Sequence, residues 1–185
     1  MIKSTRTPVS MPIFSEKCPP VRYTEGQVVF TTGCFDLFHA GHLNLLMCAK
    51  ALGGQLHVAV LADDYIRKYK GRTRPINREE ERLLIVESIR FVDRAWIARS
   101  SPNSRASIAQ LRPRAIVFGV GCTQEEHLKN EARTTRILSE FPDIDIHLFS
   151  RHVPDELSTT RIIGKIREVP DERVVHPALA NEGFL

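Results

Sequence analysis

The stretch QVVFTTGCFDLFHAGHLNLLMCAKALGG, residues 27–54, decides the fold. Its beginning, 27–32, is rich in β-branched and aromatic side chains, and this run ends at Gly33. That composition predicts a buried strand followed by a turn. The next part predicts a helix that stops at a pair of glycines, because its apolar residues recur at helical spacing: Leu45, Leu46, Ala49 and Leu52.

The rest of the chain repeats this alternation of strand and helix. Four more short apolar runs predict strands, at 56–62, 94–98, 115–119 and 144–150. Helical patterns separate them, and the last one is TTRIIGKIRE at 159–168. Strands that alternate with helices are typical of βαβ units on a parallel sheet. We therefore expect an α/β fold with a Rossmann-like, doubly wound parallel sheet in a single domain.

This domain is expected to cover residues 27–168. Residues 1–26 are rich in proline and aperiodic, which predicts an N-terminal arm, and 169–185 form a C-terminal tail. The segment RKYKGRTRPIN at 67–77 is predicted to be a basic loop. The helix predicted at 78–92 is expected to turn four apolar side chains toward the core: Leu83, Leu84, Val86 and Ile89.

Composition excludes several classes of protein. The chain has 185 residues, of which 42% are hydrophobic, and a net charge of +4. Its apolar runs are strand-sized, which predicts no membrane span, and its first residues do not resemble a signal peptide. The basic residues gather on one loop without interleaved aromatic residues, so no nucleic-acid partner is expected. Four scattered cysteines predict reduced thiols and a cytoplasmic protein.

Groups that attract phosphate follow the predicted strands. Ligands of such sheets bind beyond the carboxyl ends of the strands, where we expect 33–42, 70–74, 119–123 and 151–160 to meet. The first of these segments leads into a helix, whose free N–H groups and dipole favour an anion, and Gly41 allows a close approach. The last segment places hydroxyl groups at a second helix start. Together with the lysines and arginines of the basic loop, these groups suit a polyphosphate.

Each feature also has a simpler structural interpretation. A Ser-Thr-Thr sequence at a helix start is usually an N-cap, and a basic run is usually a solvated loop. His39 and His42 stand three residues apart, but neither HExxH nor a further cysteine or acidic cluster with ligand spacing accompanies them. No metal-ligating residue is therefore predicted. GCFDLF also differs from the GxGxxG pattern of dinucleotide-binding proteins.

Three motifs resemble one known family. GCFDLFHAGH at 33–42 resembles the HxGH signature of the cytidylyltransferase-like nucleotidyltransferases. KGRTRPINREEER at 70–82 is similar to the second motif of heptose 1-phosphate nucleotidyltransferases, without a gap. LSTTRII at 157–163 is similar to a C-terminal signature that glycerol-3-phosphate and phosphocholine cytidylyltransferases share. The resemblance covers about residues 27–168.

The resemblance implies an enzyme that transfers CMP or AMP from CTP or ATP to a small phosphorylated acceptor: a sugar, a polyol or a phosphonate. Pyrophosphate leaves, and Mg²⁺ accompanies the nucleotide. The acceptor is already anionic, so catalysis requires positioning and electrostatic stabilisation rather than a general base. The implied catalytic residues are His39, His42 and Lys70. The implied nucleotide- and phosphate-binding residues are Gly33, Cys34, Phe35, Asp36, Gly41, Arg74, Arg82, Gly119, Ser158, Thr159 and Thr160.

Some roles stay open at this point. Asp36 matches the motif but is equally suited to a structural role, and Arg82 and Arg90 are suited either to bind phosphate or to brace neighbouring loops. The family also implies a homodimer. A flavin-type (FMN) adenylyltransferase and a catalytically inactive, nucleotide-binding regulatory module remain as alternatives.

Two segments depart from the family pattern. GVGCT at 119–123 stands where the heptose enzymes carry KGGDY, so the lysine is lost at Gly119 and the acid at Cys122. VPDELST stands where cytidylyltransferases carry RTEGIST, which places Val153 and Glu156 at the arginine and glycine positions. The resemblance places these segments near the base and the acceptor. The departures therefore affect the choice of nucleotide and acceptor rather than the phosphate-binding residues.

Overall fold

The computed structural model describes residues 23–120, 124–150 and 158–169. Its centre is a five-stranded sheet in the order β3-β2-β1-β4-β5, in which every pair of neighbours is parallel. The strands are β1 (Tyr23–Gly33), β2 (Gly53–Leu61), β3 (Arg94–Ala98), β4 (Ala115–Val120) and β5 (Asp145–Ser150). Successive strands first extend the sheet to one side of β1 and then to the other, so the order reverses between β1 and β4. Ligands of such sheets bind beside this reversal.

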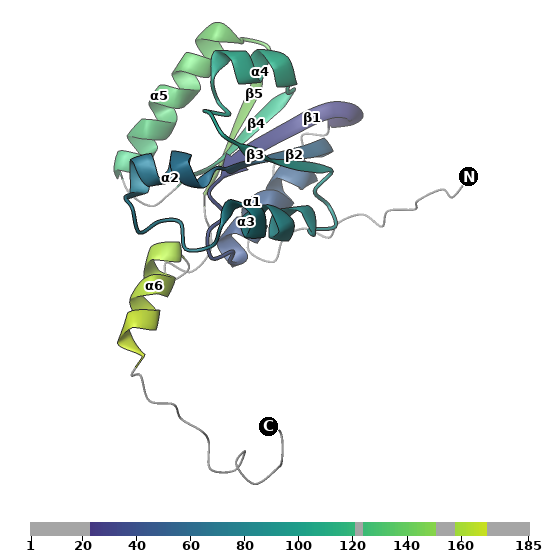
Figure 1. Ribbon diagram of the computed structural model, residues 1–185. Coiled ribbons are helices and arrows are strands. Elements are labelled where there is room, and N and C mark those ends of the chain that lie inside the picture. The colour runs from purple at the N-terminus through teal and green to yellow at the C-terminus, as the bar shows by residue number, and fades with distance from the viewer. Residues whose placement is uncertain (1–22, 121–123, 151–157, 170–185) are drawn as a thin grey trace, which may run out of the picture.

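Helices cover both faces of the sheet, as a doubly wound fold requires (Figure 1). The described helices are α1 (Ala40–Ala51), α2 (Asp63–Lys70), α3 (Glu79–Glu87), α4 (Arg105–Leu111), α5 (Gln124–Glu140) and α6 (Thr159–Glu168), of which α6 extends away from the sheet in Figure 1. Leu46 of α1 and Val86 of α3 belong to the core on one face. Ile108 of α4 and Ile137 of α5 belong to the core on the other face. The predicted α/β class and the parallel sheet are thus confirmed.

The middle of the central strand, β1, is apolar because it is buried on both faces. Val29 and Phe30 are both fully buried, but Val29 packs in the first core and Phe30 in the second. Helices cover this part of β1 on both sides, so its apolar residues run without alternation, whereas Thr24, Glu25 and Gly26 near its start are exposed.

The glycine pair that ends α1 has a steric role. Gly53 and Gly54 have φ angles of 91° and 69°. A Cβ atom on Gly53 would lie 2.4 Å from the carbonyl oxygen of Tyr23, which excludes any side chain there. The chain therefore turns directly from α1 into β2, and β2 pairs with β1 from its first residue.

Several predicted boundaries were wrong. The first part of the predicted basic loop is helical, because α2 continues to Lys70 and the helix ends at Gly71, where φ is 87°. The helix predicted at 78–92 ends at Glu87, and Leu84 is 66% exposed rather than turned to the core. The first strand begins at Tyr23, four residues before the predicted start at Gln27. None of the helices in the described part of the chain is long and apolar enough to cross a bilayer.

Candidate active site

The two histidines of the HxGH motif lie together at the amino end of α1. His39 is the N-cap residue, and its Nδ1 accepts a hydrogen bond of 3.1 Å from the amide of Gly41. The rings of His39 and His42 are stacked, with their centroids 3.9 Å apart. Because Nδ1 of His39 acts as the acceptor, the proton of the neutral ring is on Nε2. That N–H is a donor at the helix end that carries the positive dipole.

The turn that leads to these histidines has an unusual backbone. Phe35 and Leu37 have φ angles of 54° and 44°, in the left-handed region that residues with a side chain rarely adopt. Phe35 is buried, and its ring lies 3.1 Å from where a Cβ atom on Gly33 would stand. The same ring packs against His42 at 5.5 Å. Backbone strain of this kind gathers at functional sites, where the surrounding contacts maintain it.

Asp36 joins the three motifs. Its carboxylate, which is 1% exposed, forms an ion pair of 3.0 Å with Arg74. The same carboxylate accepts hydrogen bonds of 3.0 Å from the amides of Ile76 and Asn77. The hydroxyl of Thr159 donates to the Asp36 carbonyl over 3.0 Å. Asp36 therefore holds the second motif and the start of α6 against the first motif.

Arg82 braces the strand ends from inside the protein. Its side chain is fully buried and forms an ion pair of 2.7 Å with Asp63. Its guanidinium also donates to the carbonyl groups of Cys34, Leu61 and Asn77, at 2.5, 2.8 and 3.1 Å. These contacts connect the carboxyl ends of β1 and β2 with the start of α3. Of the two roles left open by the sequence, bracing is the one that these contacts perform.

Lys70 is exposed at the carboxyl end of α2, near the first motif. Burial raises the pKa of the Cys34 thiol, and the positive charges of Lys70 and Arg82 act in the opposite direction. Lys70 therefore places its charge close to the turn that carries Cys34. Cys34 is a free thiol, as predicted, and so is Cys48.

At the start of α6, one of the three predicted hydroxyl residues is a helix N-cap and another remains exposed. Ser158 is the N-cap residue and accepts a hydrogen bond of 3.2 Å from the amide of Arg161. The hydroxyl of Thr159 is bonded to Asp36, whereas Thr160 is exposed.

The predicted site residue Gly119 lies on β4, opposite Phe149 of β5.

Part of the predicted site is outside the described residues. Cys122, Val153 and Glu156 belong to segments whose structure is not described. Among the residues that are described, no group of three histidine, cysteine or acidic side chains is arranged to hold a metal ion.

The sequence missed two of the residues that organise the site. Asn77 accepts a hydrogen bond of 3.2 Å from the amide of Leu37 through Oδ1, in addition to its contact with Asp36. Glu79 is 8% exposed, accepts from the amide of Asp63 and pairs with Arg99 at 2.7 Å. The position of Asn77 within the second motif could have identified it as a residue of the site. Nothing in the local pattern distinguishes Glu79 from its exposed acidic neighbours.

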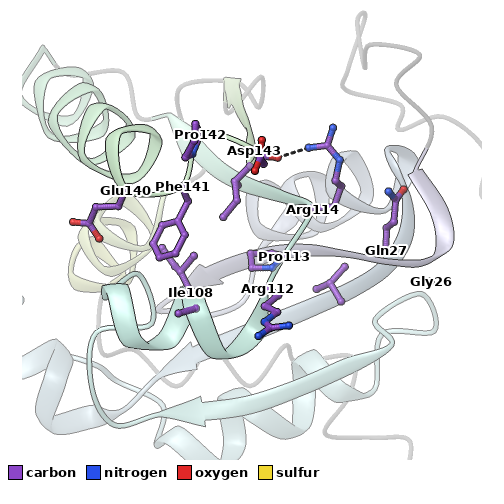
Figure 2. A pocket seen from close by; sticks show the side chains of 13 residues that line it. Gly26, Gln27, Ile108, Arg112, Pro113, Arg114, Glu140, Phe141, Pro142 and Asp143 are labelled. Carbon is purple, nitrogen blue, oxygen red and sulfur yellow. Dashed lines mark hydrogen bonds between the residues drawn. The ribbon is translucent and has the colours of Figure 1, made fainter.

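A pocket of about 670 Å³ lies elsewhere, at the amino ends of β1 and β4 (Figure 2). Figure 2 shows Arg114 directed toward Asp143, whose carbonyl oxygen it contacts at 2.6 Å. The phosphate-attracting groups are at the carboxyl ends of the strands instead. The stacked histidines, Lys70 and the start of α6 are at those carboxyl ends, so the candidate active site is separate from the pocket.

Comparisons with known proteins identify a family and several relatives. The model of a family described as cytidylyltransferase-like matches residues 30–165. The bifunctional protein HldE of Shewanella amazonensis is 43% identical over 94 residues, which are 50% of this chain and 19% of that protein. The HldE protein of Pasteurella multocida is 32% identical over 146 residues, or 78% of this chain and 29% of that protein. The chain therefore spans less than a third of the length of these relatives.

A solved structure is also similar in part. The lipopolysaccharide core biosynthesis protein of Thermoplasma volcanium is 26% identical to this chain. The match covers 67% of this chain and 94% of that one, with a TM-score of 0.49.

Proposed function

Because the chain belongs to the cytidylyltransferase-like family of nucleotidyltransferases, we propose that it transfers CMP or AMP from CTP or ATP to a small phosphorylated acceptor. One observation carries this proposal. The stacked pair of His39 and His42 is at the amino end of α1, and Asp36 holds the other two motifs beside it. This arrangement gathers donors and positive charge where a triphosphate would bind.

The proposed reaction is a direct displacement at the α-phosphorus. An oxygen of the acceptor phosphate or phosphonate forms the new bond, and the bond to the bridging oxygen of the β-phosphate breaks. Pyrophosphate leaves with the electron pair. The attacking oxygen already carries negative charge, so no proton has to be removed. Catalysis then depends on alignment and on charge stabilisation at the phosphorus.

The residues have separate tasks in this proposal. The Nε2–H of His39 and the ring of His42 hydrogen-bond to the phosphate oxygens as negative charge increases on them. Lys70 binds phosphate as a point charge. Gly33 and Gly41 allow the nucleotide to approach the backbone, and Thr160 offers a hydroxyl group to the β- and γ-phosphates. Arg74, Arg82 and Thr159 position these groups.

Mg²⁺ is the proposed companion of the triphosphate. Magnesium commonly retains water and takes few ligands from a protein when a nucleotide supplies phosphate oxygens. The Asp36 carboxylate is already engaged by Arg74 and two amides. In our proposal the ion therefore binds mainly to the nucleotide, where it reduces the repulsion that an anionic acceptor meets.

The acceptor is proposed to differ from heptose 1-phosphate. Gly119 supplies no cation for the phosphate of a sugar, and Cys122 does not accept hydrogen bonds as a carboxylate does. A site that pairs hydroxyl groups discriminates strongly, so the loss of such partners should change the preferred acceptor. We further propose a homodimer, on the basis of the family alone, and a cytoplasmic location, on the basis of the scattered cysteines.

Pyrophosphate release with a panel of acceptors tests the function. The panel contains heptose 1-phosphate, glycerol 3-phosphate, phosphocholine, FMN and a hydroxyalkyl phosphonate, each with CTP and with ATP. We expect acceptor-dependent release, with a smaller or differently charged ester ahead of heptose 1-phosphate in kcat/KM. A preference for heptose 1-phosphate would contradict our interpretation of Gly119 and Cys122. FMN as the best acceptor would favour the adenylyltransferase alternative, and nucleotide binding without turnover would favour the regulatory module.

A further inference from the structure

Helix α5 turns polar side chains toward the sheet. Asn130, Arg133, Thr134 and Ile137 follow the i, i+3, i+4, i+7 spacing of one helix face. Ile137 is fully buried in the core, and Asn130 is 7% exposed. The hydroxyl oxygen of Thr134 is buried and has no hydrogen-bond partner. Buried polar groups are normally paired, so this face of α5 calls for a specific explanation.

Arg133 is the charged member of this face. Its guanidinium lies over the ring of Phe118, 4.9 Å from the centroid. Among the side chains that the structure describes, none forms an ion pair or a hydrogen bond with it. Burial lowers the pKa of Arg133, and the nearby Arg136 acts in the same direction, while Tyr65 opposes them. A half-buried arginine whose described neighbours are aromatic rings and a second cation is suited to bind an anion.

The position of this face connects it with the active site. Phe118 directly precedes Gly119, near the carboxyl end of β4. Tyr65 belongs to α2, the helix that ends with Lys70. At a rise of about 1.5 Å per residue, Tyr65 and Lys70 are roughly 7.5 Å apart along the helix axis. The ring of Tyr69 lies 5.0 Å from that of Tyr65 and continues the aromatic surface toward Lys70.

We propose that Arg133 of α5, beside Phe118 and Tyr65, is the anion-binding residue of the acceptor subsite, and that it selects a small organic phosphate or phosphonate. Arg133 binds the anionic group of the acceptor, which replaces the cation that Gly119 lacks. The Tyr65 ring packs against its carbon skeleton. This inference rests on the proposed nucleotidyl transfer and names the class of acceptor.

Steady-state kinetics with glycerol 3-phosphate test the role of Arg133. In Arg133→Gln the KM for glycerol 3-phosphate should rise about tenfold or more, because a charged hydrogen bond is lost, while the KM for the nucleotide changes less than twofold. Arg133→Lys should recover part of the loss. Arg136→Gln is the matched control, since Arg136 lies on the same helix and pairs with Glu140 at 3.5 Å. Equal acceptor KM values in Arg133→Gln and the wild type, with only a lower Tm, would overturn the proposal.

Direct titration separates a failure of the subsite from a failure of the proposed function. Calorimetry measures binding of glycerol 3-phosphate to the wild type and to Arg133→Gln, whether or not turnover occurs. Weaker binding by Arg133→Gln supports the subsite even if no nucleotide is consumed, in which case the proposed function alone fails. Binding that is equal in both proteins, or undetectable in the wild type, overturns the subsite.

Discussion

A single carboxylate, Asp36, organises the active site at the scale of one residue. It is buried, and its charge is balanced by Arg74 and by the amides of Ile76 and Asn77. Removing one partner from a buried ion pair leaves the other uncompensated, at a cost of about 3–5 kcal/mol. The motif around Asp36 is therefore a structural connection, in addition to its proposed role in binding phosphate.

Substitution of the histidines tests their catalytic role. His39→Asn retains an N-cap acceptor but removes the imidazole donor, and His42→Ala removes the second ring. We expect turnover to fall about a hundredfold or more in each variant, as for the loss of one transition-state donor. Circular dichroism should show a folded protein in both. Turnover near that of the wild type in both variants would contradict the assigned role.

The two lysines of α2 have different expected effects. Lys70→Ala should weaken nucleotide binding and slow the chemical step, because its charge is close to the turn with Cys34. Lys68→Ala should have a smaller effect on both, since Lys68 is exposed and outside the second motif. Nucleotide titration and single-turnover rates measure the two steps separately. Equally small effects would identify this segment as solvated surface.

At the scale of an element, α2 is helical where the composition of its last residues predicted a loop, and ion pairs support the helix. Arg67 contacts Asp64 at 2.7 Å and Asp63 at 3.5 Å, one helical turn away. Acidic residues in the first turn and basic residues in the last turn also match the helix dipole. A run of lysines and arginines therefore becomes the last turn of a helix, and its final residue, Lys70, places its charge close to Cys34.

Arg82 stabilises the junction of four elements, and its removal should affect folding. Arg82→Leu leaves Asp63 and three carbonyl groups without their donor, so the free energy of unfolding should fall by about 3–5 kcal/mol. Arg90→Leu, at an exposed position near the end of the same segment, should change it by less than about 0.5 kcal/mol. Urea unfolding measures both values. Unchanged stability together with lost nucleotide binding would instead identify Arg82 as a phosphate ligand.

At the scale of the whole molecule, the two ends of the parallel strands have different roles. The proposed chemistry is at the carboxyl ends of the strands, while a side-chain network connects the strands near their amino ends. There the hydroxyl of Tyr23 donates to Asp145 over 2.9 Å and lies 2.8 Å from Nε2 of His147. Arg114 pairs with Asp145 at 3.1 Å and lies over the Tyr23 ring. This network connects β1, β4 and β5 at the end remote from the histidines.

The Tyr23 network predicts a loss of stability in alkali. Burial and the neighbouring Asp145 raise the pKa of Tyr23 to about 12, from an ordinary value of 10.0. The unfolded chain releases this proton first, so the contribution of Tyr23 is complete below pH 10 and is lost as the pH rises toward about 12. Tyr23→Phe should be less stable at pH 7 by about 1 kcal/mol, the usual value of one hydrogen bond.

Urea unfolding between pH 8 and pH 12 measures this difference. The difference in the free energy of unfolding between Tyr23→Phe and the wild type should become smaller above pH 10. The reason is that only the wild type loses the contribution of Tyr23. A gap that stays constant across this range would show that the Tyr23 proton is not linked to folding.

The sequence by itself determined the features that depend on neighbouring residues. The strand β3 at Arg94–Ala98 and the helix α6 at Thr159–Glu168 have the predicted limits, and the α/β class follows from the alternation of such segments. Periodicity and glycine stops are local signals, since backbone geometry sets which side chains share a face. The motifs also identified the family through residues that stand close together in the chain.

Only the tertiary structure decided which residues meet. Thr159 is 123 residues from Asp36, and Arg82 is 48 residues from the carbonyl group of Cys34. The polar face of α5 likewise acquires its meaning from Phe118 and Tyr65, on two other elements. Such contacts depend on how strands are ordered and helices are packed, because burial turns a solvated charge into one that must be balanced. The second motif singled out Arg82, but local composition does not reveal that its side chain is buried or which groups balance its charge.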